Sequence, residues 1–309
     1  MTSAVRHPLD GLLTVMWHYV RDPAETPLVA APGIDPGTFD GGLDLLARHR
    51  TVVDWPTVAA ALDGTAVLPE DAVLLTFDDG LADHARTVMP RLVGRGWSGV
   101  FFVMARRPGE PLTVGHALHV LLAALGENGL RDAITDALPK ADTVRFEAFQ
   151  ERERSAGVGS IDSLKRPLQR DLADTVEPTL QRLVETHVGP SGEVADALHL
   201  SPADIAAMRT NGQVIGGHGQ RHLWFDHEPT QRVADEISAS ARFLTADPRP
   251  WVFAYPYGAS DRTAAGRLAE TGFAAAFHAT PMASTGRFDL GRIDGEDPRF
   301  ADLVRGAAA

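Results

Sequence analysis

The sequence predicts an α/β fold with a mainly parallel sheet or a (β/α) barrel. Short apolar runs of strand length recur along the 309-residue chain, and most are separated by stretches with apolar residues at i, i+3 and i+4. Alternation of strands and helices in this way is typical of parallel sheets and barrels. The eight expected strands are Leu12–Trp17, Thr51–Asp54, Val73–Phe77, Gly99–Val103, Gln213–Gly217, Trp251–Tyr255, Phe273–Phe277 and Leu290–Ile293.

Three of the intervening helices have clear signals in the sequence. One helix begins at Ser201-Pro202, since Ser is favoured at the N-cap and Pro at the first helical position. The other two have apolar faces, formed by Phe39, Leu43, Leu46 and Ala47 in one and by Val233, Ile237 and Leu244 in the other.

The region 108–200 breaks the alternation, because it contains no convincing strand. Two helical stripes flank the polar stretch Glu151–Ser163; they are Leu118, Leu121, Leu122 and Leu125, then Leu164, Leu168, Leu172, Val176, Leu180 and Val184. We expect a helical insertion at about 108–200 in a single domain that spans 1–309. The insertion either shields the barrel wall as a packing cap, or binds substrate or forms an oligomer interface.

Composition limits the classes of partner and metal site. Hydrophobic residues make up 44% and charged residues 23%, which is ordinary for a soluble globular protein. The net charge of −12, from 41 acidic and 29 basic residues, argues against nucleic acid or an anionic membrane as a partner. The chain has no cysteine, so any metal ion must be held by His, Asp or Glu.

We expect no export or membrane signal in the N-terminal segment. The segment Met1–Asp10 is polar, and the apolar run Leu12–Trp17 is interrupted at His18. This run is too short for the core of a signal peptide and far too short to span a bilayer. We therefore expect a soluble, cytoplasmic protein without membrane insertion.

Two adjacent carboxylates at the end of an expected strand are the most informative feature. The run Val73–Phe77 ends abruptly in Asp78-Asp79-Gly80. Like charges this close disfavour each other's ionised form unless a positive charge lies beside them. A metal ion would supply that charge, so further ligands are expected elsewhere in the chain.

The best candidates for those ligands are His218 and His222, which follow the expected strand Gln213–Gly217. Two imidazoles and one carboxylate suit a divalent ion such as Zn²⁺ and leave positions open for water and substrate. Gly219 follows the first histidine, so this is not the His-Glu-x-x-His helix of zincin proteases. A histidine pair at this spacing is weak evidence alone, since surface histidines four apart are common.

Two further polar sites also follow expected strands. The turn Pro256-Tyr257-Gly258 could present a backbone N–H to an oxyanion, or it could simply be a rigid turn. His18 follows Leu12–Trp17 and, taken alone, would be read as a satisfied core histidine. Because barrel active sites are assembled at the C-terminal ends of the strands, the convergence of these sites predicts a catalytic centre there.

Taken together, these residues resemble the polysaccharide deacetylase family, also called the NodB-homology or carbohydrate esterase 4 group. The resemblance rests on Thr76–Gly80, His218-x-x-x-His222 and Phe253–Gly258, in the order of the family. It covers roughly residues 10–106 and 201–295, and not the helical insertion.

The resemblance implies a distorted (β/α)7-8 barrel that hydrolyses N-acyl and some O-acyl groups. It assigns Asp79, His218 and His222 to the metal and Asp78 to the general base. The backbone N–H of Tyr257 would help to hold the oxyanion. The expected cofactor is a divalent ion, with Zn²⁺ as first choice and Co²⁺, Ni²⁺ or Mn²⁺ as alternatives.

The chain departs from the family pattern in two places. The arginine that usually orients the base is missing from Phe253-Ala254-Tyr255, and Arg292 is the candidate replacement. The C-terminal Leu-x-His motif that supplies the general acid also has no match. Met16–Tyr19 matches the permuted strand of poly-N-acetylglucosamine deacetylases, which makes His18 the expected general acid and His278 its rival.

The expected function is metal-dependent removal of an N-acetyl group from an amino-sugar conjugate or a natural-product intermediate inside the cell. The partner would be a small molecule or glycan that carries an acylated amine. The alternatives are removal of a formyl group, hydrolysis of a cyclic amide, and a non-catalytic barrel that binds glycans. An intact metal triad with a neighbouring base argues against a binding module, which needs neither.

Overall fold

A computed structural model describes residues 9, 11–22, 33–260, 262–281 and 286–306. The polar segment Met1–Asp10 therefore lies almost entirely outside the described residues. No helix in the described ranges is both long and apolar enough to cross a membrane.

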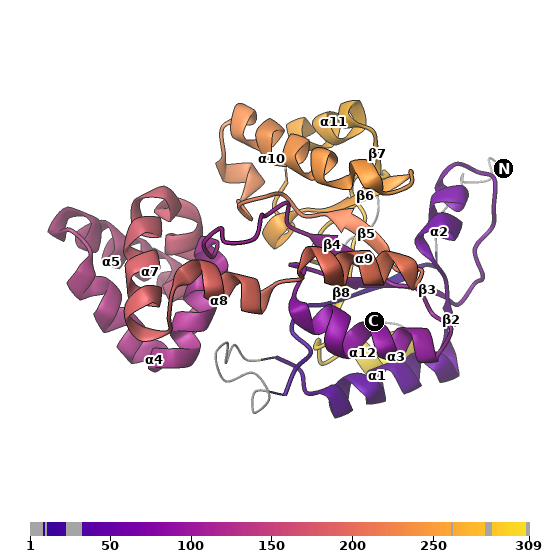
Figure 1. The fold of residues 1–309 in the computed structure, drawn as a ribbon, viewed down its shortest axis with the longest axis horizontal. Helices are drawn as coiled ribbons and strands as arrows, with labels where there is room; N and C mark the ends of the chain where they lie inside the picture. The colour runs from indigo at the N-terminus through magenta and orange to yellow at the C-terminus, as the bar shows by residue number, and fades with distance from the viewer. Residues whose placement is uncertain (1–8, 10, 23–32, 261, 282–285, 307–309) are drawn as a thin grey trace.

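The centre of the fold is a curled sheet whose described strands all pair in parallel (Figure 1). The strand order is β7-β6-β5-β4-β3-β1-β8, and β2 pairs with the start of β3. The strands are β1 (Leu13–Trp17), β2 (Thr51–Val52), β3 (Ala72–Phe77), β4 (Val100–Val103), β5 (Val214–Gly217), β6 (Trp251–Ala254), β7 (Phe273–Phe277) and β8 (Ile293–Asp294). The predicted α/β distorted barrel is confirmed.

The sheet closes irregularly between β7 and β1. Leu290 forms an isolated parallel bridge with Phe277, and β8 then pairs with Val15 and Met16 of β1. The expected strand Leu290–Ile293 is therefore wrong in its bounds. This segment crosses from one neighbour to the other instead of lying beside either for its whole length.

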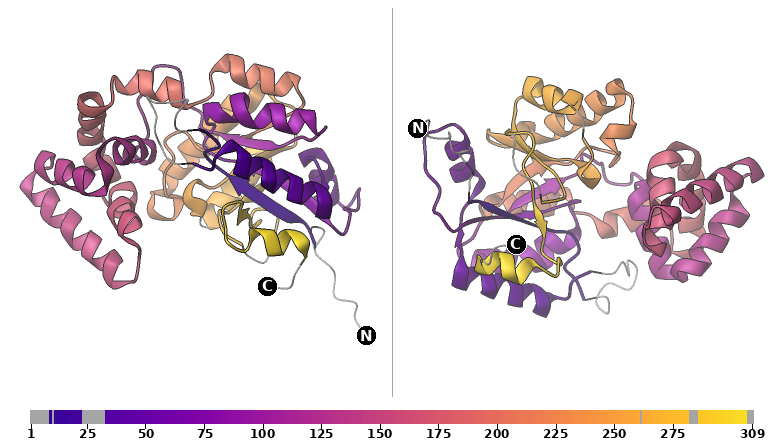
Figure 2. Two further views of the ribbon diagram at one scale, coloured as in Figure 1. Left: turned by 90° about the horizontal axis from the view of Figure 1, so that it is seen from below. Right: turned by 180° about the vertical axis from the view of Figure 1, so that it is seen from behind.

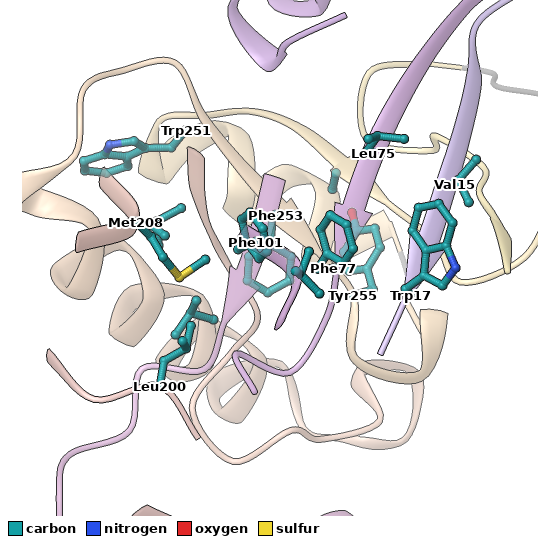
Figure 3. Packing of buried hydrophobic residues seen from close by; sticks show 14 of the residues in the cluster. Val15, Trp17, Leu75, Phe77, Phe101, Leu200, Met208, Trp251, Phe253 and Tyr255 are labelled. Carbon is teal, nitrogen blue, oxygen red and sulfur yellow. The ribbon is translucent and has the colours of Figure 1, made fainter. Parts of the chain in front are cut away.

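Both faces of the sheet are packed, as expected for strands covered by helices. On the outer face, Trp17 stacks on Phe77 and contacts Phe39 of the first helix edge-on. Phe77 in turn stacks on Phe101 of β4, and the aromatic row of this cluster is visible in Figure 3. The inner face carries a second cluster that includes Leu74, Val100, Phe102, Val252 and Phe277.

The helices that cover the barrel agree with the sequence signals in most details. Ser201 and Asp204 form a reciprocal capping box at the start of α9, as the Ser-Pro signal predicted. Ala47 is exposed, so the predicted face of α1 consists of Phe39, Leu43 and Leu46 only. The barrel helices are α1 (Pro36–His49), α2 (Trp55–Leu62), η2 (His84–Val88), α3 (Met89–Gly94), α9 (Pro202–Thr210), η4 (Phe225–His227), α10 (Thr230–Phe243), η5 (Leu244–Ala246), η6 (Pro256–Gly258), α11 (Arg262–Thr271) and α12 (Phe300–Arg305).

The chain between β4 and β5 forms a helical lobe at one side of the barrel (Figures 1 and 2). Its helices are α4 (Val114–Ala137), α5 (Lys140–Ser155), α6 (Ser160–Arg166), η3 (Pro167–Asp171), α7 (Ala173–His187) and α8 (Ser191–Leu198). Both predicted leucine stripes contribute to a core that belongs mainly to this lobe, although Tyr19 and Leu81 of the barrel also join it. We call α4–α8 the insertion.

Candidate active site

The candidate site lies at the C-terminal ends of the strands, where the chain turns away from the sheet. Asp78 and Asp79 follow β3, His18 follows β1, and His218 follows β5. The ends of β1 and β3 are joined by a hydrogen bond of 2.9 Å from the Asp78 N–H to the Trp17 carbonyl. Parallel pairing thus brings together residues that are far apart in the sequence.

The pleat of β3 separates the two aspartates. Side chains alternate along a strand, so Asp78 points to the same side as Leu74 and Thr76, which is the inner face. Asp79 leaves the strand with a φ of 74°, and Gly80 follows with a φ of 62°. A Cβ on Gly80 would lie 2.9 Å from Val103 Cγ1, which explains the glycine after the pair.

Arg292 holds Asp78 from inside the barrel. Its Nη1 and Nη2 donate to the two carboxylate oxygens of Asp78 at 2.6 Å each, and its Nε donates to the His278 carbonyl at 2.8 Å. Burial alone would raise the pKa of Asp78, but the Arg292 guanidinium, with His218, outweighs it and keeps this pKa below its ordinary value. The bidentate pair fixes the carboxylate plane and keeps it ionised.

His18 lies beside this carboxylate, whereas His278 faces elsewhere. The Nε2 of His18 is 3.9 Å from Asp78 Oδ2, and the side chain is 36% exposed. His278 instead donates from Nδ1 to the Gly258 carbonyl at 2.9 Å, and its Nε2 lies 3.6 Å from Asp289. Of the two predicted acid candidates, His18 is the one that the structure brings next to Asp78.

Asp79, His218 and His222 converge on a common point. Asp79 Oδ1 lies 3.3 Å from His218 Nε2 and 3.2 Å from His222 Nε2, and the two Nε2 atoms are 3.2 Å apart. The three potential ligand atoms all lie within 4.8 Å of one another. All three side chains are at least nine-tenths buried.

The loop that carries the two histidines is held in place by hydrogen bonds to Ala254 and Glu236. The His218 Nδ1–H donates to the Ala254 carbonyl at 2.8 Å, so neutral His218 has its lone pair on Nε2. The buried Glu236 carboxylate accepts hydrogen bonds from the Gln220 and Arg221 N–H groups at 2.7 and 2.9 Å. These contacts fix the turn between the two imidazoles and direct both Nε2 atoms toward Asp79.

Burial and neighbouring charges shift the pKa values of this cluster, and they favour an ionised Asp79 carboxylate. Burial alone would raise the pKa of Asp79, but the imidazoles around it, His222 foremost, hold it well below its ordinary value. Burial lowers the pKa of His222 to about 4, so that this ring is neutral at pH 7. Burial alone would lower the pKa of His218, but the neighbouring carboxylates of Asp79 and Asp78 outweigh burial and raise this pKa.

The donor set fits a divalent cation. Asp79 Oδ1 is buried and has no hydrogen-bond donor among the described residues, although two imidazole nitrogens lie beside it. A buried carboxylate oxygen without a donor is costly unless a cation binds it. Two imidazoles and one carboxylate are a typical ligand set for zinc at sites that keep positions open. The three residues would therefore hold such an ion.

Backbone strain is concentrated in this site. Among the described residues, only three that are not glycine have a positive φ: Asp79 at 74°, His222 at 57° and Tyr257 at 58°. Such conformations cost about 1–3 kcal/mol each and persist where the surrounding structure holds them. These three residues are two candidate metal ligands and the candidate oxyanion residue, so the strain coincides with the candidate site.

The Tyr257 side chain forms one wall of the site. Its ring packs edge-on against His222, with centroids 4.4 Å apart, and stacks on Trp224 at 4.5 Å. Burial, together with the charge of Asp79, raises the pKa of the phenol, which stays protonated. Trp224 was not predicted, because nothing in its local sequence distinguishes it from a core aromatic residue.

The insertion reaches the site through the first turns of α4, which sequence reasoning also missed. His116 Nε2 is 3.3 Å from Asp79 Oδ2, and the Tyr19 hydroxyl is 3.0 Å from His119 Nδ1. A cavity of about 170 Å³ beside His222 has walls from both the insertion and the barrel. The insertion is therefore not only a cap on the barrel wall. The spacing His116-x-x-His119 was the available signal.

A family model and solved structures are similar to this chain. The family model described as Polysaccharide deacetylase matches residues 176–276. No curated protein sequence matches the chain. The solved structure of IcaB from Ammonifex degensii shares 18% identity, with a TM-score of 0.60, and the match covers 96% of this chain and 97% of that one.

Two other solved structures have the same fold. The deacetylase PplD from Streptococcus pyogenes, in complex with acetate, has a TM-score of 0.56 at 16% identity over 92% of this chain and 91% of its own. A de-N-acetylase from Aggregatibacter actinomycetemcomitans has a TM-score of 0.57 at 16% identity over 95% and 99%. At these identities the structures establish similarity of fold.

Proposed function

The chain resembles the polysaccharide deacetylases in motif, fold and family match, and from this premise we propose that it is a metal-dependent hydrolase. It would remove an N-acetyl group from a substrate that contains an amino sugar. One observation carries the proposal: the Asp79–His218–His222 cluster lies beside a second carboxylate, Asp78, whose two oxygens are held by Arg292. A binding module has no need of this combination.

The two aspartates have different tasks in this proposal. Asp79 would hold the ion with His218 and His222, whose Nε2 atoms lie 3.3 and 3.2 Å from the same Asp79 oxygen. When bound, a divalent cation supplies Lewis-acid chemistry, since it polarises a carbonyl oxygen and lowers the pKa of water. Zn²⁺ is the first choice for this donor set, and Co²⁺, Ni²⁺ and Mn²⁺ are the alternatives.

Asp78 would act as general base. Its oxygens accept two hydrogen bonds from Arg292, which holds the carboxylate in one orientation and keeps it ionised at neutral pH. Each oxygen has further lone pairs that can accept a proton from an attacking water molecule. General base catalysis by a positioned group typically contributes about 10²–10⁴-fold to the rate.

Tyr257 and His18 would act on the other atoms of the amide. The Tyr257 N–H, in a turn at the end of β6, would donate to the developing oxyanion, an interaction worth about 3–4 kcal/mol. His18, partly exposed and 3.9 Å from Asp78, would give a proton to the nitrogen of the leaving amine. An amide nitrogen leaves poorly without that proton.

The similar proteins support this substrate class. One is described as a de-N-acetylase, and another is described in complex with acetate, the product expected of this reaction. The acidic net charge of −12 suits a neutral or cationic glycan better than an anionic one.

The test is release of acetate by the zinc-loaded protein from a panel of acylated amines. We expect acetate from N-acetylglucosamine or its β-linked oligomers, with the matching free amine appearing at the same rate. If formate were released from N-formyl analogues at a higher kcat/KM than acetate from the N-acetyl substrates, the protein would be a deformylase instead. A protein that binds these glycans but releases no acid would be a binding module, against the proposal.

His18 and His278 can be distinguished as acids. We expect His18→Ala to lower kcat by about 10²–10⁴-fold on an unactivated amide. Its effect on an ester with a good leaving group should be much smaller, because that group needs no proton. If His278→Ala shows this difference between substrates and His18→Ala does not, the assignment of the acid is wrong.

A further inference from the structure

The first turns of α4 contact three separate parts of the candidate active site. His116 contacts Asp79, and His119 contacts Tyr19. Gly115 lies against Tyr257, since a Cβ at this glycine would be 2.7 Å from the Tyr257 hydroxyl oxygen. The start of the insertion is thus packed against the residues that surround Asp79.

His116 is held in one orientation by its own helix. Thr113, the N-cap of α4, accepts a hydrogen bond from the His116 backbone N–H at 3.4 Å. The Thr113 hydroxyl lies 2.8 Å from His116 Nδ1. A hydroxyl can accept from one group and donate to another, so Thr113 can donate to Nδ1 while it caps the helix.

The Asp79 carboxylate determines which His116 nitrogen carries a hydrogen. An ionised carboxylate can only accept, so His116 donates from Nε2, which lies 3.3 Å from Asp79 Oδ2, and Nδ1 can accept from the Thr113 hydroxyl. The other Asp79 oxygen, Oδ1, faces His218 and His222. The two oxygens of the Asp79 carboxylate therefore face different groups: Oδ1 faces the other candidate metal ligands, and Oδ2 faces the insertion.

We propose that His116 is a positioning residue that orients Asp79 for metal binding, so that the insertion completes the metal site of the barrel. This inference rests on the proposed function, because it presumes that Asp79 binds a metal ion. The physical reason is that a carboxylate with one oxygen held by a hydrogen bond loses less rotational freedom when the other binds a cation. Such contacts to metal ligands typically change metal affinity by about 10–100-fold.

The insertion thereby has a task that neither a wall cap nor an oligomer interface would require. The helix α4, which Thr113 caps, must be docked for His116 to reach Asp79. The buried His199 ring packs edge-on against the His116 ring, with centroids 4.7 Å apart, and so limits the movement of that ring. Docking of the insertion and metal binding should then favour each other.

The experiment measures zinc affinity by competition with a chromogenic chelator, using the full-length protein. We expect His116→Ala to weaken zinc binding by about 10–100-fold. His116→Gln should recover most of the loss, because its amide N–H₂ can donate where Nε2–H did. His187→Gln is the matched control, since His187 is an exposed histidine of the same insertion, and it should bind zinc as the wild type does.

Two further readouts separate positioning from folding and from ligation. Thermal unfolding of the metal-free proteins should remain a cooperative transition in both His116→Ala and His116→Gln, so that a general folding defect cannot explain the loss of zinc binding. The visible absorption spectrum of the Co²⁺-loaded protein should be unchanged in shape by His116→Gln, since the ligands are the same. A spectrum with altered band positions would make His116 a ligand and overturn the positioning role.

The outcomes also separate this inference from the proposed function. Wild-type zinc affinity in His116→Ala would overturn the inference alone. A wild-type protein that binds no zinc would overturn the proposed metal site as well. Weakened binding in both His116 variants to the same extent would show that the hydrogen bond is not the cause and would also overturn the inference.

Discussion

The barrel and the insertion meet at one carboxylate, but they are built in different ways. The barrel places its polar residues at the ends of strands whose side chains alternate between two packed faces. The insertion has a core of its own and approaches the site with one side of α4. The barrel thus contains the groups that would do the chemistry, whereas the insertion would adjust how one of them is held.

The contacts between the two regions differ in strength. Ion pairs from Arg221 and Arg232 to Asp174 of α7 lie at the surface, where such pairs contribute about 0–1 kcal/mol. The contact between His116 and Asp79 is buried, so its loss leaves polar atoms without partners, at a higher cost. Docking of the insertion should therefore depend more on the start of α4 than on the surface ion pairs.

The largest expected effect is on the barrel side, at Asp78. We expect Asp78→Asn to lower kcat by about 10²–10⁴-fold while zinc affinity stays near that of the wild type, because the amide cannot act as a base. Steady-state kinetics and the chelator competition measure the two quantities. A large loss of zinc affinity would mean that Asp78 is a ligand, and the division of work between the two aspartates would fail.

Arg292 should matter next, for stability and for its pH dependence. Arg292→Gln leaves the buried Asp78 carboxylate without its cation, which should lower the free energy of unfolding by about 3–5 kcal/mol at pH 7. Arg287→Gln is a control, since Arg287 forms a surface ion pair with Asp63, and it should cost at most about 1 kcal/mol. Urea unfolding measures both.

The sign of the pH effect distinguishes an electrostatic role of Arg292 from a simple packing defect. In the wild type the folded-state pKa of Asp78 is lowered, so its contribution to stability is present at neutral pH and is lost as pH falls through that pKa. In Arg292→Gln, burial would raise the folded-state pKa instead. The variant should then lose stability as pH rises above about 4, the ordinary value for Asp. A constant difference between variant and wild type over this range would contradict the electrostatic explanation.

The smallest effect on the barrel is expected from a change in the core of the insertion. Leu180 is fully buried in that core, so Leu180→Ala should cost about 2–5 kcal/mol. Hydrogen exchange should show the loss of protection mainly in α4–α8. Leu75 is equally buried in the core of the barrel, so Leu75→Ala should instead reduce exchange protection in β3 and its neighbours. Equal loss everywhere in both variants would mean that the two regions unfold as one unit.

The sequence was most informative where local pattern and geometry agree. All eight apolar runs form strands or bridges of the sheet, because an apolar run of four to six residues between helices has few other places to lie. The ends of the expected strands also predicted that Asp78, Asp79, His18 and His218 lie together, since residues just after neighbouring parallel strands lie at the same edge of the sheet. Arg292 was predicted as the partner of Asp78, and the structure brings the two together.

The sequence was least informative where contacts depend on how distant segments dock. His116 and Glu236 are a helical histidine and a helical glutamate with no local mark of their partners, which are 37 and 16 residues away. The predicted bounds of β8 were wrong because the segment first bridges to β7 at Leu290 and only then pairs with β1. The stretch Glu151–Ser163 was identified only as polar; its first residues complete α5, stabilised by ion pairs between Arg152, Glu153 and Asp171.

The most direct test of the metal site is the zinc content of the wild type and three variants after exposure to zinc and removal of loosely bound ions. We predict that the wild type and Asp78→Asn retain stoichiometric zinc, whereas Asp79→Ala and His222→Ala retain almost none. Elemental analysis gives the answer without any substrate. Unchanged zinc in both Asp79→Ala and His222→Ala would contradict the central claim that these residues form a metal site.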